Sequence, residues 1–285
     1  MGTFVGTGLP WSRRAIGSLL QYGLLLGLAA LTVFPFLWMV TSSLKSDLDV
    51  FAIPPTLLPR SVVWDAYPNL FKLVPFATYA WNSTKIAVLV VIGQMFLCSL
   101  AGYGFARLRF PGSTVCFALL MGALMVPEAV TIIPRYLLFR NLGMLDSHWP
   151  LILPPAVANS FGTFLMRQFF MTIPKDLEEA ARLDGAGYFG IYWRIMLPLS
   201  KPALAALAIL AFLASWNNFF GALIYLNTEE LYTLPIGLAT LVGEYQSEWP
   251  EVLAGAGLSM APIFLVYVFA QRRFVEGIAF SGTKG

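Results

Sequence analysis

An acidic residue inside a long apolar stretch is the first candidate for chemistry in this sequence. Glu128 lies within residues 114–139, which are mostly apolar. A charge in such a stretch is costly in lipid and usually faces a bundle interior or a water-filled cavity. Glu128 is therefore either a polar contact on a path through a membrane, or a structural carboxylate. In the second case it pairs with Arg135, about two helical turns away, or is held protonated.

Amide and aromatic residues form a second candidate group. Trp216, Asn217 and Asn218 lie in the apolar stretch 203–226, which also contains Tyr225, and Asn159 lies in the apolar stretch 151–171. Amides both donate and accept hydrogen bonds, and aromatic rings stack on sugar faces, so the pattern suits a neutral polyol. The alternative is hydrogen bonding between helices by the amides and ordinary packing by the rings.

The most charged stretch between two long apolar segments runs from Thr172 to Pro202. Pro174 suits a first helical turn, and the acids Asp176, Glu178 and Glu179 follow it, where the positive end of a helix dipole favours them. Gly185 stands where a helix ends in a left-handed residue. The pattern predicts a short exposed helix over residues 174–184, followed by a second amphipathic piece over 188–196.

One face of this predicted helix is small and apolar. Leu177, Ala180, Ala181 and Asp184 recur at i, i+3, i+4 and i+7, and the alanines would let this face lie close against another surface. Glu178 and Arg182 form an i, i+4 pair on its flank. The alternative interpretation is an ordinary solvated loop.

Composition indicates a membrane protein. Of the 285 residues, 58% are hydrophobic and 12% are charged, about half the charge that a soluble domain carries. The net charge of +3 gives no indication of nucleic-acid binding. No glycine-rich phosphate loop is found in the sequence, so nucleotide chemistry would belong to a partner. We expect no catalytic residues, no metal site and no cofactor in this chain.

Six apolar segments are long enough to span a membrane. They cover residues 16–40, 81–106, 114–139, 151–171, 203–226 and 252–271. We therefore expect an all-α membrane protein in three parts: residues 1–78 with the tail, the first span and an outer loop; residues 79–271 with the other spans; and a polar tail over 272–285. Residues 227–251 would form an acidic loop.

Charge distribution predicts the orientation of these spans. Twelve of the 18 Lys and Arg residues belong to the side of the chain termini and six to the other side. Basic residues favour the cytoplasmic side. The termini and the 172–202 stretch are therefore predicted to be cytoplasmic.

The 172–202 stretch also resembles a known family motif. Glu179-Ala180-Ala181, Asp184-Gly185-Ala186, Ile195, Leu197-Pro198 and Pro202 are similar to the EAA loop of the membrane subunits of ABC importers. The Trp216-Asn217 pattern resembles the fifth span of sugar-importer permeases. The end of the chain, with Lys284-Gly285, resembles the C-terminus of a maltose-transporter permease. On these residues the chain is identified as a carbohydrate-uptake, binding-protein-dependent ABC importer permease.

The resemblance implies a type I permease fold with six transmembrane helices in the cytoplasmic (inner) membrane of a prokaryote. It further implies a heterodimer with a second permease subunit, two ATPase subunits that bind ATP and Mg, and an extracytoplasmic solute-binding protein. The chain would move a sugar or related polyol, and would not itself be an enzyme. A non-sugar ABC permease, for a polyamine or phosphate, and an ion-coupled secondary transporter remain alternatives.

The resemblance also implies roles for particular residues. In the family, the EAA loop is a coupling helix that docks into the ATPase, and the C-terminus inserts between the ATPases. The expected ATPase-coupling residues are Glu178, Glu179, Ala180, Ala181, Asp184, Gly185 and Lys284. The candidates for the solute path are Glu128, Asn159, Trp216, Asn217, Asn218 and Tyr225.

Overall fold

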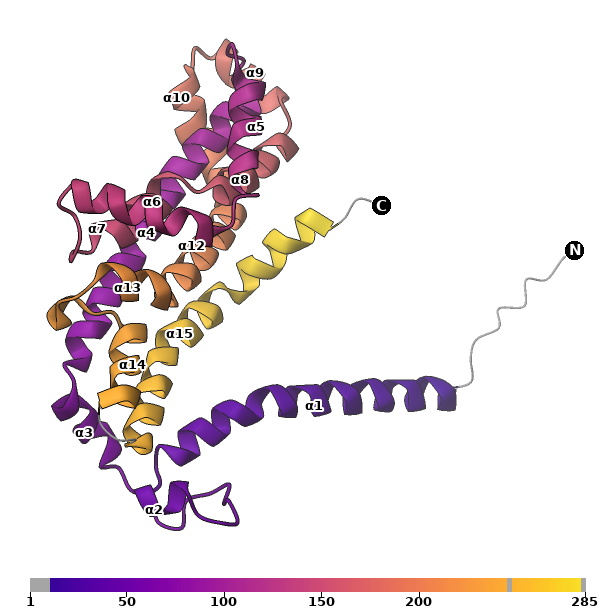
Figure 1. The fold of residues 1–285 in the computed structure, drawn as a ribbon. Helices are drawn as coiled ribbons and strands as arrows, with labels where there is room; N and C mark the ends of the chain where they lie inside the picture. Colours follow the sequence, from indigo (N-terminus) through magenta and orange to yellow (C-terminus); the bar gives the residue numbers. More distant parts are fainter. Residues whose placement is uncertain (1–10, 245–247, 283–285) are drawn as a thin grey trace, which may run out of the picture. The chain divides into compact units, whose positions relative to one another are not determined.

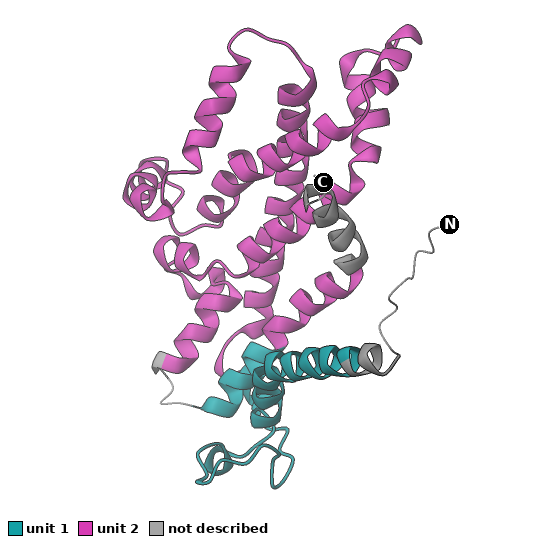
Figure 2. Ribbon diagram, turned by 90° about the vertical axis from the view of Figure 1, so that its right-hand side faces the viewer, with its two compact units in different colours: residues 1–70, 248–257 teal, residues 71–247, 258–285 magenta. Residues whose placement is uncertain are grey.

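The computed structural model describes residues 11–244 and 248–282, and these residues divide into two compact units (Figure 1, Figure 2). One unit comprises residues 1–70 and 248–257, and the other comprises residues 71–247 and 258–285. No strand occurs among the described residues. The predicted all-α fold is confirmed.

The first unit contains the first apolar segment. Helix α1 (Trp11–Ser42) covers the predicted span over residues 16–40. Its leucines are largely exposed, Leu19 at 72% and Leu31 at 73%, as expected for a helix whose neighbours are lipid or another subunit. Short helices α2 (Asp47–Val50) and α3 (Ala66–Leu73) follow it. The buried ammonium of Lys45 donates to the carbonyl of Thr56 at 2.6 Å, which ties down the connection.

Helix α4 (Phe76–Arg107) is the centre of the second unit. It lies against α7 (Trp149–Val157), α8 (Ser160–Thr172) and α12 (Lys201–Trp216) (Figure 1). A Cβ added at Gly93 would approach the Cβ of Ala156 to 2.7 Å, and one at Gly102 would approach the Cβ of Met166 to 2.8 Å. Glycine at these positions therefore permits close helix packing, as the small residues of this segment predict.

Three of the predicted spans are broken, so the count of six continuous spans is not reproduced exactly. Residues 114–139 divide into α5 (Ser113–Ala123) and α6 (Glu128–Asn141), bent by 101°. Residues 151–171 divide between α7 and α8, and residues 203–226 divide between α12 and α13 (Phe219–Tyr225). By length and composition, three described helices could cross a membrane, or five if each of two bent pairs is one span.

The breaks have local causes. Pro127 caps α6 and has no N–H to continue the preceding helix. Asn159 and Asn218 each accept a hydrogen bond at the side chain from a backbone N–H of the following helix, from Gly162 at 2.6 Å and Gly221 at 2.9 Å. Such caps start a new helix. The amides that the sequence placed inside spans therefore lie at helix boundaries.

The predicted acidic loop and the predicted polar tail both contain more helix than expected. Residues 227–251 include a 3-10 turn (Glu229–Leu231) and helix α14 (Leu234–Glu244). Leu234, Ile236 and Leu241 of α14 are buried, so α14 packs into the second unit and is not an open loop. Helix α15 (Trp249–Gly282) continues through most of the predicted polar tail.

Candidate functional site

The predicted short exposed helix is present as α9 (Asp176–Leu183). It begins two residues later than predicted, because Pro174 precedes the helix and Lys175 occupies the N-cap. At its end Gly185 has φ 83°, its N–H donates to the carbonyl of Arg182, and the N–H of Ala186 donates to that of Ala181. These two bonds form the Schellman arrangement that a glycine in the left-handed region allows.

Glu178 faces the interior of the chain. Its side chain is 6% exposed, and its Oε1 lies 2.7 Å from Nε of Arg107, whose side chain is 5% exposed. This contact is an ion pair and not an aligned hydrogen bond. The second carboxylate oxygen lies 3.7 Å from Arg182, which confirms the predicted i, i+4 pair. Glu178 therefore does not belong to the exposed coupling surface expected from the sequence, because this chain already buries it.

Arg107 joins three segments of the second unit. Its guanidinium donates to the backbone carbonyls of Phe170, at the end of α8, and of Ile173, just beyond it, in addition to pairing with Glu178. Arg107 is the last residue of α4. The base of α9 is thereby attached to the long central helix by a buried charge.

The outward surface of α9 contains Leu177, Ala180 and Asp184 of the predicted face, and Ala181 departs from it. Glu179, Ala180, Asp184 and Leu183 are exposed, Leu183 at 90%. Ala181 is half-buried and packs against the apolar cluster around Met166 and Phe170, so its small size serves the interior of this unit. Lys284, the remaining predicted coupling residue, lies outside the described residues.

Exposed aromatic residues that the sequence analysis did not single out follow α9. Tyr188 and Phe189 of α10 (Tyr188–Ile191) and Trp193 of the π-helical turn (Tyr192–Met196) are each more than half exposed. Phe189 and Trp193 stack with their ring centroids 6.4 Å apart. Their i, i+4 spacing was visible in the predicted amphipathic piece, but the side that they face was not. The turn continues into α11 (Leu197–Leu199).

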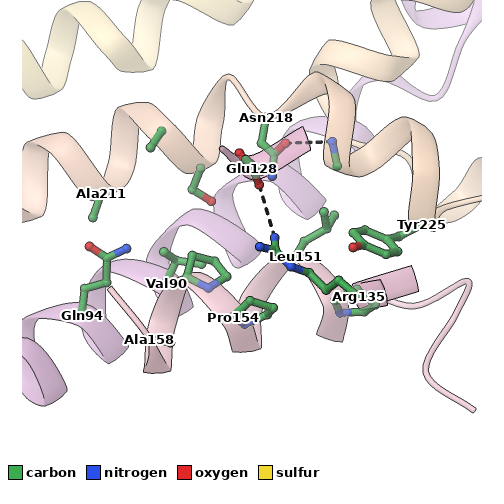
Figure 3. A pocket seen from close by; sticks show the side chains of 15 residues that line it. Val90, Gln94, Glu128, Arg135, Leu151, Pro154, Ala158, Ala211, Asn218 and Tyr225 are labelled. Atoms are coloured by element: carbon green, nitrogen blue, oxygen red, sulfur yellow. Dashed lines mark hydrogen bonds and ion pairs between the residues drawn. The ribbon is translucent and has the colours of Figure 1, made fainter. Parts of the chain in front are cut away.

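A cavity of about 370 Å³ lies between α4, α6, α7, α12 and α13 (Figure 3). It contains three of the predicted path residues, Glu128, Asn218 and Tyr225. Glu128 Oε1 lies 3.2 Å from Nη1 of Arg135, whose Nη2 donates to the Thr131 hydroxyl at 3.1 Å. The pairing with Arg135, one of the two alternatives from the sequence, is present, and Glu128 also lines this cavity.

A second cavity of about 540 Å³ adjoins the first. Both cavities are lined by Glu128, Arg135 and Ala158, and the second also contains the predicted residue Asn159. The Glu128–Arg135 pair therefore lies where the two cavities meet.

Gln94 of α4 is the cavity residue that the sequence analysis missed. Its side chain is 3% exposed and lines the 370 Å³ cavity, and the described part of the chain gives its carboxamide no hydrogen-bond partner. Figure 3 shows this carboxamide turned into the cavity. A glutamine among apolar residues on a membrane helix was the available signal.

Two predicted path residues do not line either cavity. Trp216 is buried, and its indole N–H donates to the carbonyl of Ser259 at 3.1 Å. The Asn217 side chain donates to the carbonyl of Leu213 in its own helix. The buried Trp216 fits the alternative of ordinary packing, whereas Asn217 bonds within its own helix and not between helices. Asn218 both caps α13 and lines the cavity.

The segment between α6 and α7 carries a histidine and an aspartate with shifted pKa values. Burial lowers the pKa of His148, with a smaller contribution in the same direction from the charge of Lys85, against a hydrogen bond from Nε2 to the Leu231 carbonyl at 2.8 Å. Asp146 accepts hydrogen bonds from the Thr228 hydroxyl and from two backbone N–H groups, which lower its pKa. Both residues hold the 227–231 segment in place.

Comparisons with known proteins agree on one family. The model of the family described as "Binding-protein-dependent transport system inner membrane component" matches residues 24–279. The arabinooligosaccharides transport system permease protein AraQ of Halalkalibacterium halodurans is 34% identical, over 96% of this chain and 100% of its own. The galactooligosaccharides transport system permease protein GanQ of Bacillus subtilis is 33% identical, over 96% of this chain and 98% of its own.

Two further similarities extend the range of solutes. The sn-glycerol-3-phosphate transport system permease protein UgpE of Yersinia enterocolitica is 33% identical, over 94% of this chain and 97% of its own. A chain from the crystal structure of a bacterial ABC transporter involved in the import of the acidic polysaccharide alginate superposes with a TM-score of 0.82 at 28% identity. This superposition covers 94% of this chain and 100% of the other.

Proposed function

Because the chain belongs to the family of binding-protein-dependent transport system inner membrane components, we propose that it is the permease subunit of an ATP-driven importer of a sugar or related polyol. The names of the relatives support the solute class, since they include arabinooligosaccharide and galactooligosaccharide permeases. The match extends over nearly the whole chain, and the fold superposes on a chain of the solved importer with a TM-score of 0.82.

The proposed assembly contains a second permease subunit, two ATPase subunits and an extracytoplasmic solute-binding protein. ATP and Mg would bind to the ATPases, because the sequence has no phosphate-binding loop. The chain would lie in the cytoplasmic membrane of a prokaryote with both termini and α9 inside, as the twelve-to-six split of basic residues supports.

The role of this chain in the proposed cycle is mechanical. Helix α9 is the element that would sit in a cleft of the ATPase, with Glu179, Ala180, Leu183 and Asp184 exposed toward it. The buried attachment of Glu178 to Arg107 joins α9 to the end of α4. Movement of α9 with a closing ATPase would therefore displace α4, which carries one wall of the polar cavity.

The observation that carries this proposal is an exposed, rigidly capped short helix anchored to the central membrane helix. The test is to purify the tagged chain from its native host, identify copurifying proteins, and reconstitute the complex in liposomes. We expect an ATPase to copurify and sugar uptake to require ATP and the binding protein. Uptake that needs no ATP and stops when an ionophore collapses the ion gradient would favour the secondary-transporter alternative.

A further inference from the structure

The two polar cavities share α6 as a wall, and few charged side chains line them. Among the residues that line the 370 Å³ and 540 Å³ cavities, one acid and one base are present, Glu128 and Arg135. Glu128 Oε1 lies 3.2 Å from Nη1 of Arg135, and Nη2 of Arg135 donates a hydrogen bond to the Thr131 hydroxyl at 3.1 Å. Arg135 is thus paired within α6 before any solute arrives, and the 79% exposed side chain of Glu128 keeps the pair open to an approaching solute.

We infer that these cavities take an uncharged polyhydroxylated solute segment and discriminate against an anionic one, with Glu128 as the discriminating residue. The inference rests on the proposed function and specifies its solute class. An anion that approached Arg135 would have to displace the carboxylate of Glu128 and would then lie beside that charge. Juxtaposed like charges oppose binding, and a cation already paired offers an anion little net attraction.

The remaining polar groups suit hydroxyl groups. Gln94 is buried, turned into the cavity and without a hydrogen-bond partner in the described chain. Its carboxamide offers a donor and an acceptor, which a sugar hydroxyl satisfies at the same time. Asn218 uses its carboxamide oxygen to cap Gly221 at 2.9 Å, so its NH₂ is the group directed to a ligand. The amide atoms of Gln94 are open to the cavity, so a neutral hydroxyl-bearing ligand can hydrogen-bond to them there.

The location of the ion pair gives it control over passage. Glu128 and Arg135 line both cavities, so a solute that moves from one cavity to the other passes them. Figure 3 shows the pair lying between Asn218 and the wall formed by Leu151 and Pro154. The solved transporter involved in the import of the acidic polysaccharide alginate is a natural comparison for solute charge, because its solute is acidic.

The test measures binding to the whole permease–ATPase complex in lipid nanodiscs without the solute-binding protein, so that its selectivity does not enter. The probes are arabinotriose, which is neutral, and a trimer of uronic acid, which is anionic. We expect the unmodified complex to prefer arabinotriose. In Glu128→Gln the guanidinium of Arg135 loses its charged partner, and affinity for the uronate trimer should rise about tenfold, the effect of one charge-assisted hydrogen bond.

Two further variants make the result specific. Glu230→Gln removes the same charge from an exposed position outside both cavities, and its selectivity should not change. Gln94→Leu should weaken arabinotriose binding without improving uronate binding. Equal or tighter binding of the uronate trimer by the unmodified complex would overturn the inference, as would identical behaviour of Glu128→Gln and Glu230→Gln.

A separate measurement distinguishes failure of the inference from failure of the proposed function. ATP-driven uptake of sugar by the same complex with its binding protein tests the function alone. If uptake proceeds but neither trisaccharide binds the complex, the cavities of this chain hold no solute, and the inference is wrong while the function stands. A complex without any ATP-driven sugar uptake contradicts the proposed function itself.

Discussion

Arg107 and Glu178 lie 71 positions apart in the sequence (178 − 107), yet their side chains meet 2.7 Å apart in a buried ion pair. Arg107 closes the long central helix α4, and Glu178 lies in the first turn of α9. The same guanidinium holds the carbonyls of Phe170 and Ile173. One buried cation thereby sets the position of the predicted coupling helix.

Removing the acid of this pair should detach α9. In Glu178→Ala the guanidinium of Arg107 stays buried without its countercharge, which typically costs about 3–5 kcal/mol. We expect a lower melting temperature of the purified chain and faster protease cleavage within residues 172–187. Glu179→Ala, an exposed neighbour on the same helix, is the matched control and should leave both measurements unchanged. Equal melting temperatures and equal rates of protease cleavage in the two variants would show that the ion pair does not anchor α9.

The exposed acid should act on the partner instead. Reversing its charge in Glu179→Lys changes no contact that the structure records within the chain, so insertion and melting temperature should be preserved. Docking of the ATPase should weaken, because a carboxylate on this surface would meet a basic side chain in a charge-assisted bond. The measurement is recovery of the ATPase in a pull-down, together with the stimulation of hydrolysis by the loaded binding protein. Normal recovery and stimulation would count against α9 as the docking element.

The left-handed glycine after α9 offers a clean backbone test. Gly185→Ala should cost about 1 kcal/mol or more, because its φ of 83° is unfavourable for a residue with a Cβ. Gly187→Ala is the matched control, since Gly187 has φ −75° and open space around its Cα. We expect reduced stimulated ATP hydrolysis for Gly185→Ala only. A similar loss in both variants would mean that the helix end is not the sensitive feature.

Topology follows from the distribution of basic residues and can be read with a reporter that is active only in the cytoplasm. Fusions after Gly112 and after Lys175 should be active, and a fusion within residues 227–244 should be silent. The prediction derives from the positive-inside rule. The reverse pattern would place α9 outside, where no ATPase could reach it, and would contradict the coupling role.

The single histidine of the chain predicts a pH dependence. Because burial lowers the pKa of His148 in the folded protein, the unfolded chain binds its proton more readily. The contribution to stability is complete above the unfolded pKa, about 6.5, and is lost as pH falls below it toward the folded pKa. Melting temperature should therefore drop from pH 7.5 to 5.5 by more in the unmodified chain than in His148→Gln. Parallel curves would show that His148 does not contribute.

The sequence by itself determined the local features. The acids of the first turn of α9 and the glycine at its end depend on residues within one helix, and the structure confirms them, although the helix begins two residues after Pro174. The apolar segments, the all-α class and the family motif were likewise local or compositional properties. Membrane insertion depends on segment hydropathy, so these could be read without knowledge of neighbours.

The tertiary structure decided which way each polar side chain faces. Adjacent acids on α9 have opposite roles, because Glu178 turns toward Arg107 while Glu179 stays exposed. Gln94 lines a cavity, whereas Trp216 packs against Ser259. The breaks at Asn159 and Asn218 also appeared only in the fold. The physical reason is that burial and pairing depend on helices distant in the sequence, and hydropathy cannot report which of a helix's faces they cover.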